Sequence, residues 1–263
     1  MSGVVLRKTL RDLRWALVWW SLGVFAVVLL MAALWPSVRD VYTTELLQAY
    51  PEELQEVFNF GDAMDGATYL NIELHSMILP VLFGVFAIGR GARLIAGEEQ
   101  DGTLEPVVAS PVPRWSILLQ KGIGLAVALV ALGIVLGVAT LVGSAVGDLG
   151  IPARQAFVGA LAMVLLGLYA GATALAVGAG TGRRGVAIAS AGLILVGGYL
   201  LHVIGAILPA VEPWRAASPF TQAIDAGPVG DVVPWGFALL AGTAVALVAA
   251  SVGVFARRDL RTP

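Results

Sequence analysis

Six long apolar segments constrain the fold of this 263-residue chain more than any other feature. Each is about 20 residues long, which is the length that an α-helix needs to cross a bilayer. None shows the apolar–polar alternation of membrane β-strands. The segments cover approximately Trp15–Leu34, Leu70–Ile88, Ile123–Val146, Phe157–Gly178, Val186–Leu208 and Val233–Phe255. The sequence therefore predicts an all-α, polytopic membrane protein with six transmembrane helices.

The composition supports a membrane location. Hydrophobic residues make up 58% of the chain and charged residues 13%, whereas soluble domains carry about 25% charged residues. A soluble fold could not bury so much apolar surface, so we expect residues 1–263 to form a single transmembrane domain without a nucleotide-binding domain. Cysteine is absent, which excludes disulfides and thiolate metal sites. The net charge of −2 gives no support for a nucleic-acid partner.

The distribution of Lys and Arg predicts the orientation. The N-terminus and the second loop hold four each, the fourth loop two and the C-terminus three, which is thirteen of the sixteen basic residues. The other three are Arg39, Arg154 and Arg215. Because cytoplasmic loops hold the excess of Lys and Arg, both termini are expected in the cytoplasm. The first apolar segment is long enough to span, so we interpret it as an anchor and not as a cleaved signal.

Three segments outside the spans are expected at the membrane surfaces. Apolar and basic residues alternate at helical spacing in residues 1–14, which predicts an amphipathic surface helix; the alternative is a ragged start of the first span. The acidic outer loop 36–69 contains "TELLQAYPEELQEVFNF", which predicts one or two short amphipathic helices, with a solvated loop as the alternative. The prolines of residues 209–232 exclude one continuous helix and favour short re-entrant or interfacial helices.

Glycines at helical spacing inside the spans predict close helix packing. The positions are Gly133, Gly137, Gly167, Gly171 and Gly178. Small residues allow helix backbones to approach one another in a bilayer. The pattern indicates a helix bundle and gives no information on a substrate.

Motifs for catalysis are missing from the sequence. It contains no P-loop "GxxxxGK[ST]", no "HExxH" and no "GxSxG". The pair Glu98–Glu99 is similar to the glutamates of some intramembrane proteases, but a polar "QDG" follows it. We therefore expect no catalytic residue, no metal and no bound cofactor, and hence a protein that is not an enzyme.

A few polar residues lie near the outer ends of the predicted spans. They are Asn71, Glu73, His75 and His202. Intramembrane ionisable groups often mark a substrate or proton path, so these four are candidate path residues. The alternative is an interfacial polar collar, with His202 as a packing histidine. No charge is predicted at mid-membrane depth, so the energy for any transport must come from another subunit.

The most polar run, "GEEQDGTLEPVVASPVPRWSILLQK" (residues 97–121), lies within the cytoplasmic loop 89–121. It predicts a short helix, a turn at Asp101–Gly102 with a positive φ at the glycine, and Thr103 as N-cap of a second helix. Prolines 111 and 113 end that helix. A short, charged helix–turn–helix segment of this kind is suited to docking with a soluble partner. An ordinary solvated loop is the alternative.

This run resembles the coupling segment of ABC-2 (type-2 ATP-binding cassette) exporter permeases. That segment reads E-x-x-x-G-T-L-E, then P-V-x-R, then a lysine that opens the third span. The matching residues here are Glu98, Gly102, Thr103, Leu104, Glu105, Pro111, Val112, Arg114 and Lys121. Pro106 and Pro113 depart from the pattern. The resemblance extends over the whole chain, including six spans, an acidic first outer loop and "SPF" at 218–220.

The resemblance implies how the protein works. Two copies of an ABC-type ATPase would bind ATP and Mg, and a second permease copy, identical or closely homologous, would complete a dimer in a prokaryotic plasma membrane. The implied ATPase-interface residues are Gly97, Glu98, Glu99, Asp101, Gly102, Thr103, Leu104, Glu105 and Arg114. Glu98 and Glu105 would pair with basic groups of the ATPase. The dimer interface would use the first span, near Val24, and the outer part of the fifth, near Val203.

The substrate class follows only weakly. Without buried charge, the bundle favours export of an amphipathic or hydrophobic substrate. The alternative function is a membrane scaffold or assembly factor that an ATPase drives mechanically.

Overall fold

The computed structural model describes residues 3–39, 65–109 and 111–258. Within these ranges the only regular secondary structure is helix, and six helices are long and apolar enough to span a membrane. They are α1 (Val4–Val38), the run Ile78–Gln100 that starts with α5 (Ile78–Ala92), α8 (Arg114–Gly147), α9 (Ala153–Thr181), α10 (Arg184–Ile207) and α13 (Gly236–Arg257). The prediction of an all-α fold with six membrane helices is confirmed.

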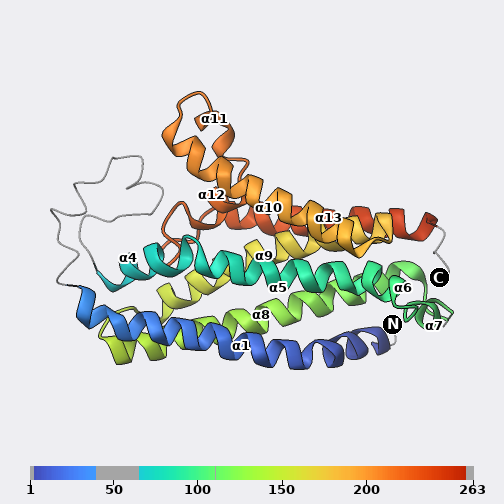
Figure 1. Cartoon of the computed structure of the whole chain (residues 1–263), viewed down its shortest axis with the longest axis horizontal. Coiled ribbons are helices and arrows are strands. Elements are labelled where there is room, and N and C mark those ends of the chain that lie inside the picture. Colours follow the sequence, from blue (N-terminus) through green and yellow to red (C-terminus); the bar gives the residue numbers. More distant parts are fainter. Residues whose placement is uncertain (1–2, 40–64, 110, 259–263) are drawn as a thin grey trace.

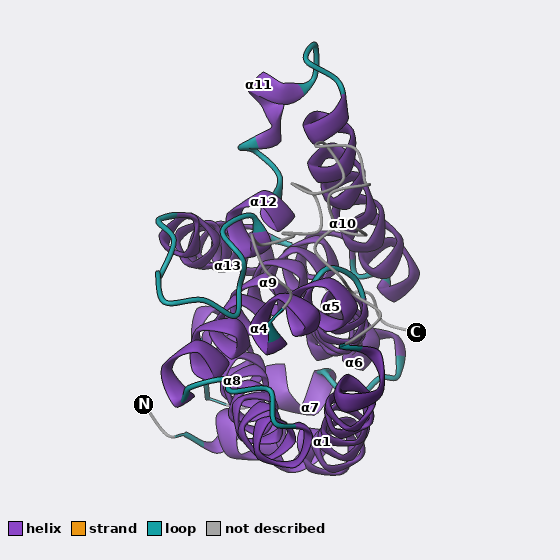
Figure 2. Ribbon diagram, turned by 90° about the vertical axis from the view of Figure 1, so that its left-hand side faces the viewer, coloured by secondary structure: helices purple, strands orange, loops and turns teal. Residues whose placement is uncertain are grey.

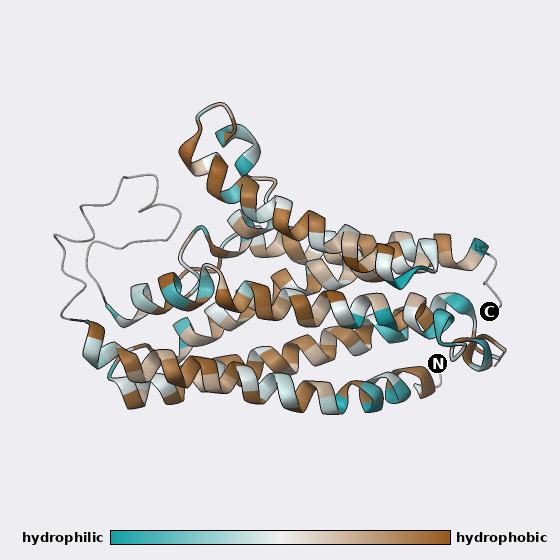
Figure 3. Ribbon diagram, in the orientation of Figure 1, coloured by the Kyte–Doolittle hydropathy of each residue, from teal (hydrophilic) through white to brown (hydrophobic). Residues whose placement is uncertain are grey.

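The helices form a bundle around α9, which packs against α5, α8, α10 and α13, while α1 packs mainly on α8. Figures 1 and 2 show α1 and α8 on one side of the bundle and α10 and α13 on the other. In Figure 3 the middles of the long helices are hydrophobic, and hydrophilic residues gather at the start of α1 and around α6 and α7. This distribution matches an apolar bilayer core between two polar surfaces.

Glycine allows the closest contacts in the bundle. A Cβ on Gly171 would lie 3.2 Å from the carbonyl oxygen of Ala87, and a Cβ on Gly133 would lie 2.2 Å from a methyl group of Val164. Gly137 likewise leaves room for the ring of Phe157. The predicted close packing at these glycines is confirmed.

Two helix starts differ from the sequence prediction. Residues 4–14 form the first turns of α1, with no break before the span, so they are not a separate surface helix. The second span begins at Ile78 and not at Leu70, after α4 (Gly66–Leu70) and a π-helical turn, η1 (Asn71–His75). Pro80 explains this start, because its ring excludes a helical carbonyl four residues earlier, and Met77 leaves helical geometry with φ −144°.

The structure describes segment 209–232 in full and segment 36–69 in part. Short helices α11 (Glu212–Arg215) and α12 (Pro219–Ile224) confirm the expectation of short helices within 209–232. Ser218 caps α12 by accepting hydrogen bonds from the backbone N–H groups of Phe220 and Thr221. The amphipathic helices expected in loop 36–69 fall on 40–64, outside the described residues.

Candidate functional site at the α5–α8 connection

The α5–α8 connection lies at the end of the bundle where α1 begins and α13 ends (Figure 1). α5 continues through a π-helical turn, η2 (Arg93–Gly97), into α6 (Glu98–Gln100). Gly102 then reverses the chain with φ +69°, as predicted. A short helix, α7 (Glu105–Val108), follows. Such π-helical turns in membrane and soluble helices are frequent at functional sites.

The prediction for Thr103 as an N-cap is wrong. Leu104 precedes α7, and no side chain caps that helix. The Thr103 hydroxyl instead donates to the backbone carbonyl of Glu98 at 3.3 Å. The backbone N–H groups of Thr103 and Leu104 donate to the same carbonyl. The threonine therefore closes the turn onto the end of α6.

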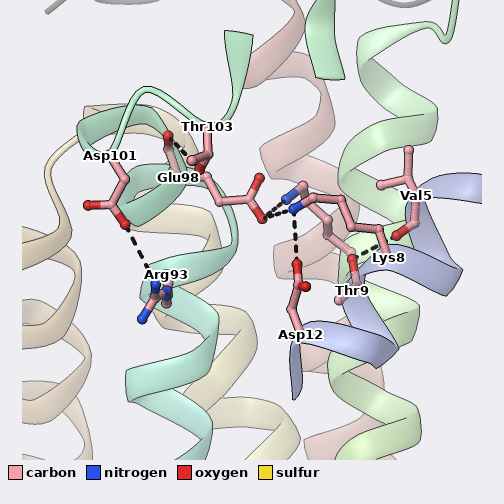
Figure 4. A network of polar contacts seen from close by, with 9 residues as sticks. Val5, Lys8, Thr9, Asp12, Arg93, Glu98, Asp101 and Thr103 are labelled. Carbon is pink, nitrogen blue, oxygen red and sulfur yellow. Dashed lines mark hydrogen bonds and ion pairs between the residues drawn. The ribbon is translucent and has the colours of Figure 1, made fainter. Parts of the chain in front are cut away.

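Glu98 points into the bundle. Its Oε1 lies 2.7 Å from Nζ of Lys121 in α8 and 3.4 Å from Nζ of Lys8 in α1. Lys8 also forms an ion pair with Asp12 at 3.0 Å (Figure 4). The side chain of Lys121 is only 1% exposed and that of Glu98 14%. One carboxylate thus joins the connection to two membrane helices.

Glu99 makes a second inward contact. Its buried carboxylate pairs with Arg258, at the end of α13, and Nη1 of Arg114 donates to the Arg258 carbonyl at 2.8 Å. Gly182, between α9 and α10, lies against this pair with φ +64°, and a Cβ there would collide with both side chains. The pair therefore needs glycine beside it.

The sequence-predicted interface residues divide into two sets. Asp101, Thr103 and Glu105 are exposed, whereas Glu99, Leu104 and Gly97 are buried. Asp101 forms only a long ion pair with Arg93 at 3.7 Å, and both side chains are 54% exposed. Glu98 pairs with Lys121 and Lys8 of the same chain, and its expected pairing with a basic group of an ATPase stays a prediction.

Sequence reasoning missed these internal partners. The ion pair of Lys121 could have been predicted, because a basic residue next to a long apolar segment needs an anionic partner when it is buried. The ion pairs of Lys8 and Arg258 could not have been predicted, since both residues lie in basic termini where solvated charges are usual.

The candidate path residues do not form one site. Asn71 Oδ1 accepts a hydrogen bond from the backbone N–H of Val229 at 2.9 Å, and His75 Nδ1 lies 3.1 Å from the Leu70 carbonyl. His202 contacts the Thr221 hydroxyl at 3.0 Å, on α12, and Glu73 is partly exposed. These local contacts fit the alternative of a polar collar; a substrate path through them stays a prediction. No group of three His, Asp or Glu side chains that could hold a metal occurs in the described ranges.

The comparisons identify the family. A family model described as "ABC-2 family transporter protein" matches residues 4–260. The chain belongs to the ABC-2 transporter family. Curated proteins gave no match. The resemblance to ABC-2 permeases is thereby confirmed, and the chain is a multi-pass membrane permease of an ABC transporter. Membership implies an ABC ATPase as partner of this permease, and ABC-2 permeases are typically non-catalytic subunits.

Proposed function

We propose that this permease is the membrane subunit of an ATP-driven exporter in a prokaryotic plasma membrane, and that the α5–α8 connection couples ATP hydrolysis to its helices. ATP and Mg would bind to two copies of the partner ATPase. The observation that carries the proposal is the pairing of two adjacent glutamates with three membrane helices. Glu98 reaches α8 and α1, and Glu99 reaches α13.

The α5–α8 connection has an outward face that a soluble partner can contact and an inward face that holds it to the membrane helices. The outward face, with Asp101, Thr103 and Glu105, is available to a soluble partner. The inward ion pairs are largely desolvated, so they resist separation more strongly than surface pairs do. A displacement of the connection by the ATPase would therefore move α1, α8 and α13 together.

The apolar exposed faces support a dimer around a central path. α1 exposes Trp19 and Leu22, α5 exposes Val81, and α10 exposes Leu193 and Leu200. These helices are neighbours in the bundle, because α5 packs against α10 and touches α1. Two such faces, from identical or closely homologous copies, would enclose an apolar path suited to an amphipathic or hydrophobic substrate.

The experiment is co-purification of the permease with its ATPase, together with ATP hydrolysis by the complex. Glu105→Lys reverses an exposed charge on the outward face, and Gly102→Val forces a β-branched residue into a positive φ. Both should lower recovery of the complex while the permease still inserts. The matched control is Glu212→Lys, an exposed glutamate at the other end of the bundle. Full assembly and hydrolysis in both connection variants would contradict the proposal.

A further inference from the structure

A polar hollow of about 460 Å³ lies between the start of α1 and the α5–η2–α6 run. Ligand pockets for small molecules typically occupy about 300–1,000 Å³, so the hollow could hold a compact polar group. The residues around it are Lys8, Thr9, Asp12, Leu13, Arg90, Arg93, Leu94, Glu98, Asp101 and Thr103. Figure 4 shows Glu98 reaching across to Lys8 and Asp12 of α1, while Arg93 and Asp101 pair with each other on the other side of the connection.

Most charges of this hollow are compensated by a neighbour. Lys8 pairs with Asp12, and Arg93 with Asp101. The charge of Glu98 is balanced by Lys121 behind it.

Arg90 is the exception. Among the described residues it forms no hydrogen bond or ion pair, and it lines the hollow. One unpaired positive charge therefore remains at the hollow, and an anion could pair with it.

An apolar groove continues along the same pair of helices. About 330 Å³ in volume, it is lined by Trp19, Trp20, Gly23, Val24, Val27 and Leu82. It begins seven residues after Asp12 on α1, which is about 10 Å nearer to the middle of the membrane. The α1–α5 seam thus presents a cationic hollow at the bundle end and an apolar groove at membrane depth. A phospholipid in one leaflet has the same order, with its headgroup at the membrane surface and its acyl chains at membrane depth.

We propose that the α1–α5 seam binds an anionic phospholipid, with its phosphate at Arg90 and one acyl chain in the groove beside Gly23. Basic pockets between membrane helices on the cytoplasmic side are a general means of holding acidic headgroups. The site shares Trp19 with the proposed dimer face and Asp101 and Thr103 with the outward face of the connection, but lipid binding to the purified permease requires neither the ATPase nor transport. It requires only that the hollow and the groove are open to lipid.

The test uses the purified, delipidated full-length permease in a neutral detergent. Phosphatidylglycerol, phosphatidylcholine with the same acyl chains, and glycerol phosphate are titrated separately, and thermal unfolding is recorded. Because a ligand that binds only the folded state raises Tm more, at the same free concentration, the more tightly it binds, phosphatidylglycerol should stabilise the protein more than the other two do. Equal stabilisation by phosphatidylcholine would show that the headgroup charge does not contribute to binding. Equal stabilisation by glycerol phosphate would show that the acyl chain does not contribute. Either result overturns the proposal.

Two pairs of variants locate the site. Arg90→Gln should weaken the apparent affinity for phosphatidylglycerol by about tenfold or more, as expected for loss of a charged hydrogen bond. The matched control is Arg257→Gln, an exposed arginine on α13, which should bind as the unmodified protein does. Arg93→Gln, which lines the hollow and has a side chain that is 54% exposed, provides a second measurement if Arg90→Gln does not fold.

The groove is tested in the same way. A Cβ atom at Gly23 or at Gly242 would meet no atom within 4 Å, and both glycines are exposed on their helices. Gly23→Phe should fill the groove and reduce lipid binding, whereas Gly242→Phe on α13 should not. Unchanged binding in both Arg90→Gln and Arg93→Gln, or in Gly23→Phe, would refute the proposed site.

Discussion

The Oε1 atom of Glu98 lies 2.7 Å from Nζ of Lys121, and the lysine side chain is only 1% exposed. A lysine so deeply buried requires an anion, because an isolated charge in an apolar environment is very costly. The two residues come from opposite ends of the connection and hold its start against α8. This ion pair therefore fixes the connection to the bundle.

Lys121→Met should destabilise the permease strongly. It leaves the Glu98 carboxylate without its nearest partner, and breaking a buried pair costs about 3–5 kcal/mol. Lys8→Met should cost at most about 1 kcal/mol, because the Lys8 side chain is 44% exposed. The double variant Glu98→Gln/Lys121→Met should be less destabilised than Lys121→Met alone. Thermal unfolding in detergent measures all three, and equal losses for Lys8→Met and Lys121→Met would contradict the assignment.

Gly182→Ala should be more damaging than an ordinary glycine substitution. Its Cβ would collide with the Glu99–Arg258 pair, and its φ of +64° disfavours any side chain. Gly150→Ala is the matched control, because Gly150 has φ +69° but open space around it. Both variants carry the backbone strain, so the difference between their Tm values measures the effect of the collision alone. If the two variants unfold at the same temperature, Gly182 does not protect the ion pair.

Local physics explains which features the sequence predicted. Each span depends on the apolar residues of its own segment, and the positive φ of Gly102 depends on the residues of its own turn. Both features could therefore be predicted from the sequence. The direction of Glu98 could not be predicted, because its partners lie in α8 and α1 and only the tertiary fold brings them together. The position of Val24 could not be predicted either. Membrane helices are apolar on their lipid-facing and buried faces alike, and Val24 is fully buried where an exposed dimer contact had been expected.

Cross-linking should therefore use other positions on α1. Leu22 is 55% exposed and Leu200 on α10 is 49% exposed. If α1 and α10 form the dimer interface, a single cysteine at Leu22 or Leu200 should give a covalent dimer in native membranes. A cysteine at Val24 is the internal control, because its burial should prevent the cross-link. A cross-link at Val24 with none at Leu22 or Leu200 would contradict the proposed interface.

Cysteine labelling also tests the orientation. The chain has no cysteine of its own, so single cysteines report cleanly. Because thirteen of the sixteen basic residues lie at one end of the predicted topology, that end should be cytoplasmic. Glu212→Cys should react with an impermeant maleimide in intact cells, and Arg184→Cys only after lysis. The reverse pattern would invert the proposed orientation.

Coupling and assembly should be separable at the connection. Glu105 faces outward, so Glu105→Lys should reduce binding of the ATPase, by about 2–5 kcal/mol where its partner charge is desolvated. Glu99→Gln leaves the outward face unchanged and weakens the inward pair with Arg258. The complex of Glu99→Gln should therefore form normally but show reduced stimulation of ATP hydrolysis by substrate, because α13 no longer follows the connection. Co-purification and hydrolysis with and without substrate measure the two effects. If Glu99→Gln assembles and retains full stimulation, the inward pair serves stability alone and transmits nothing.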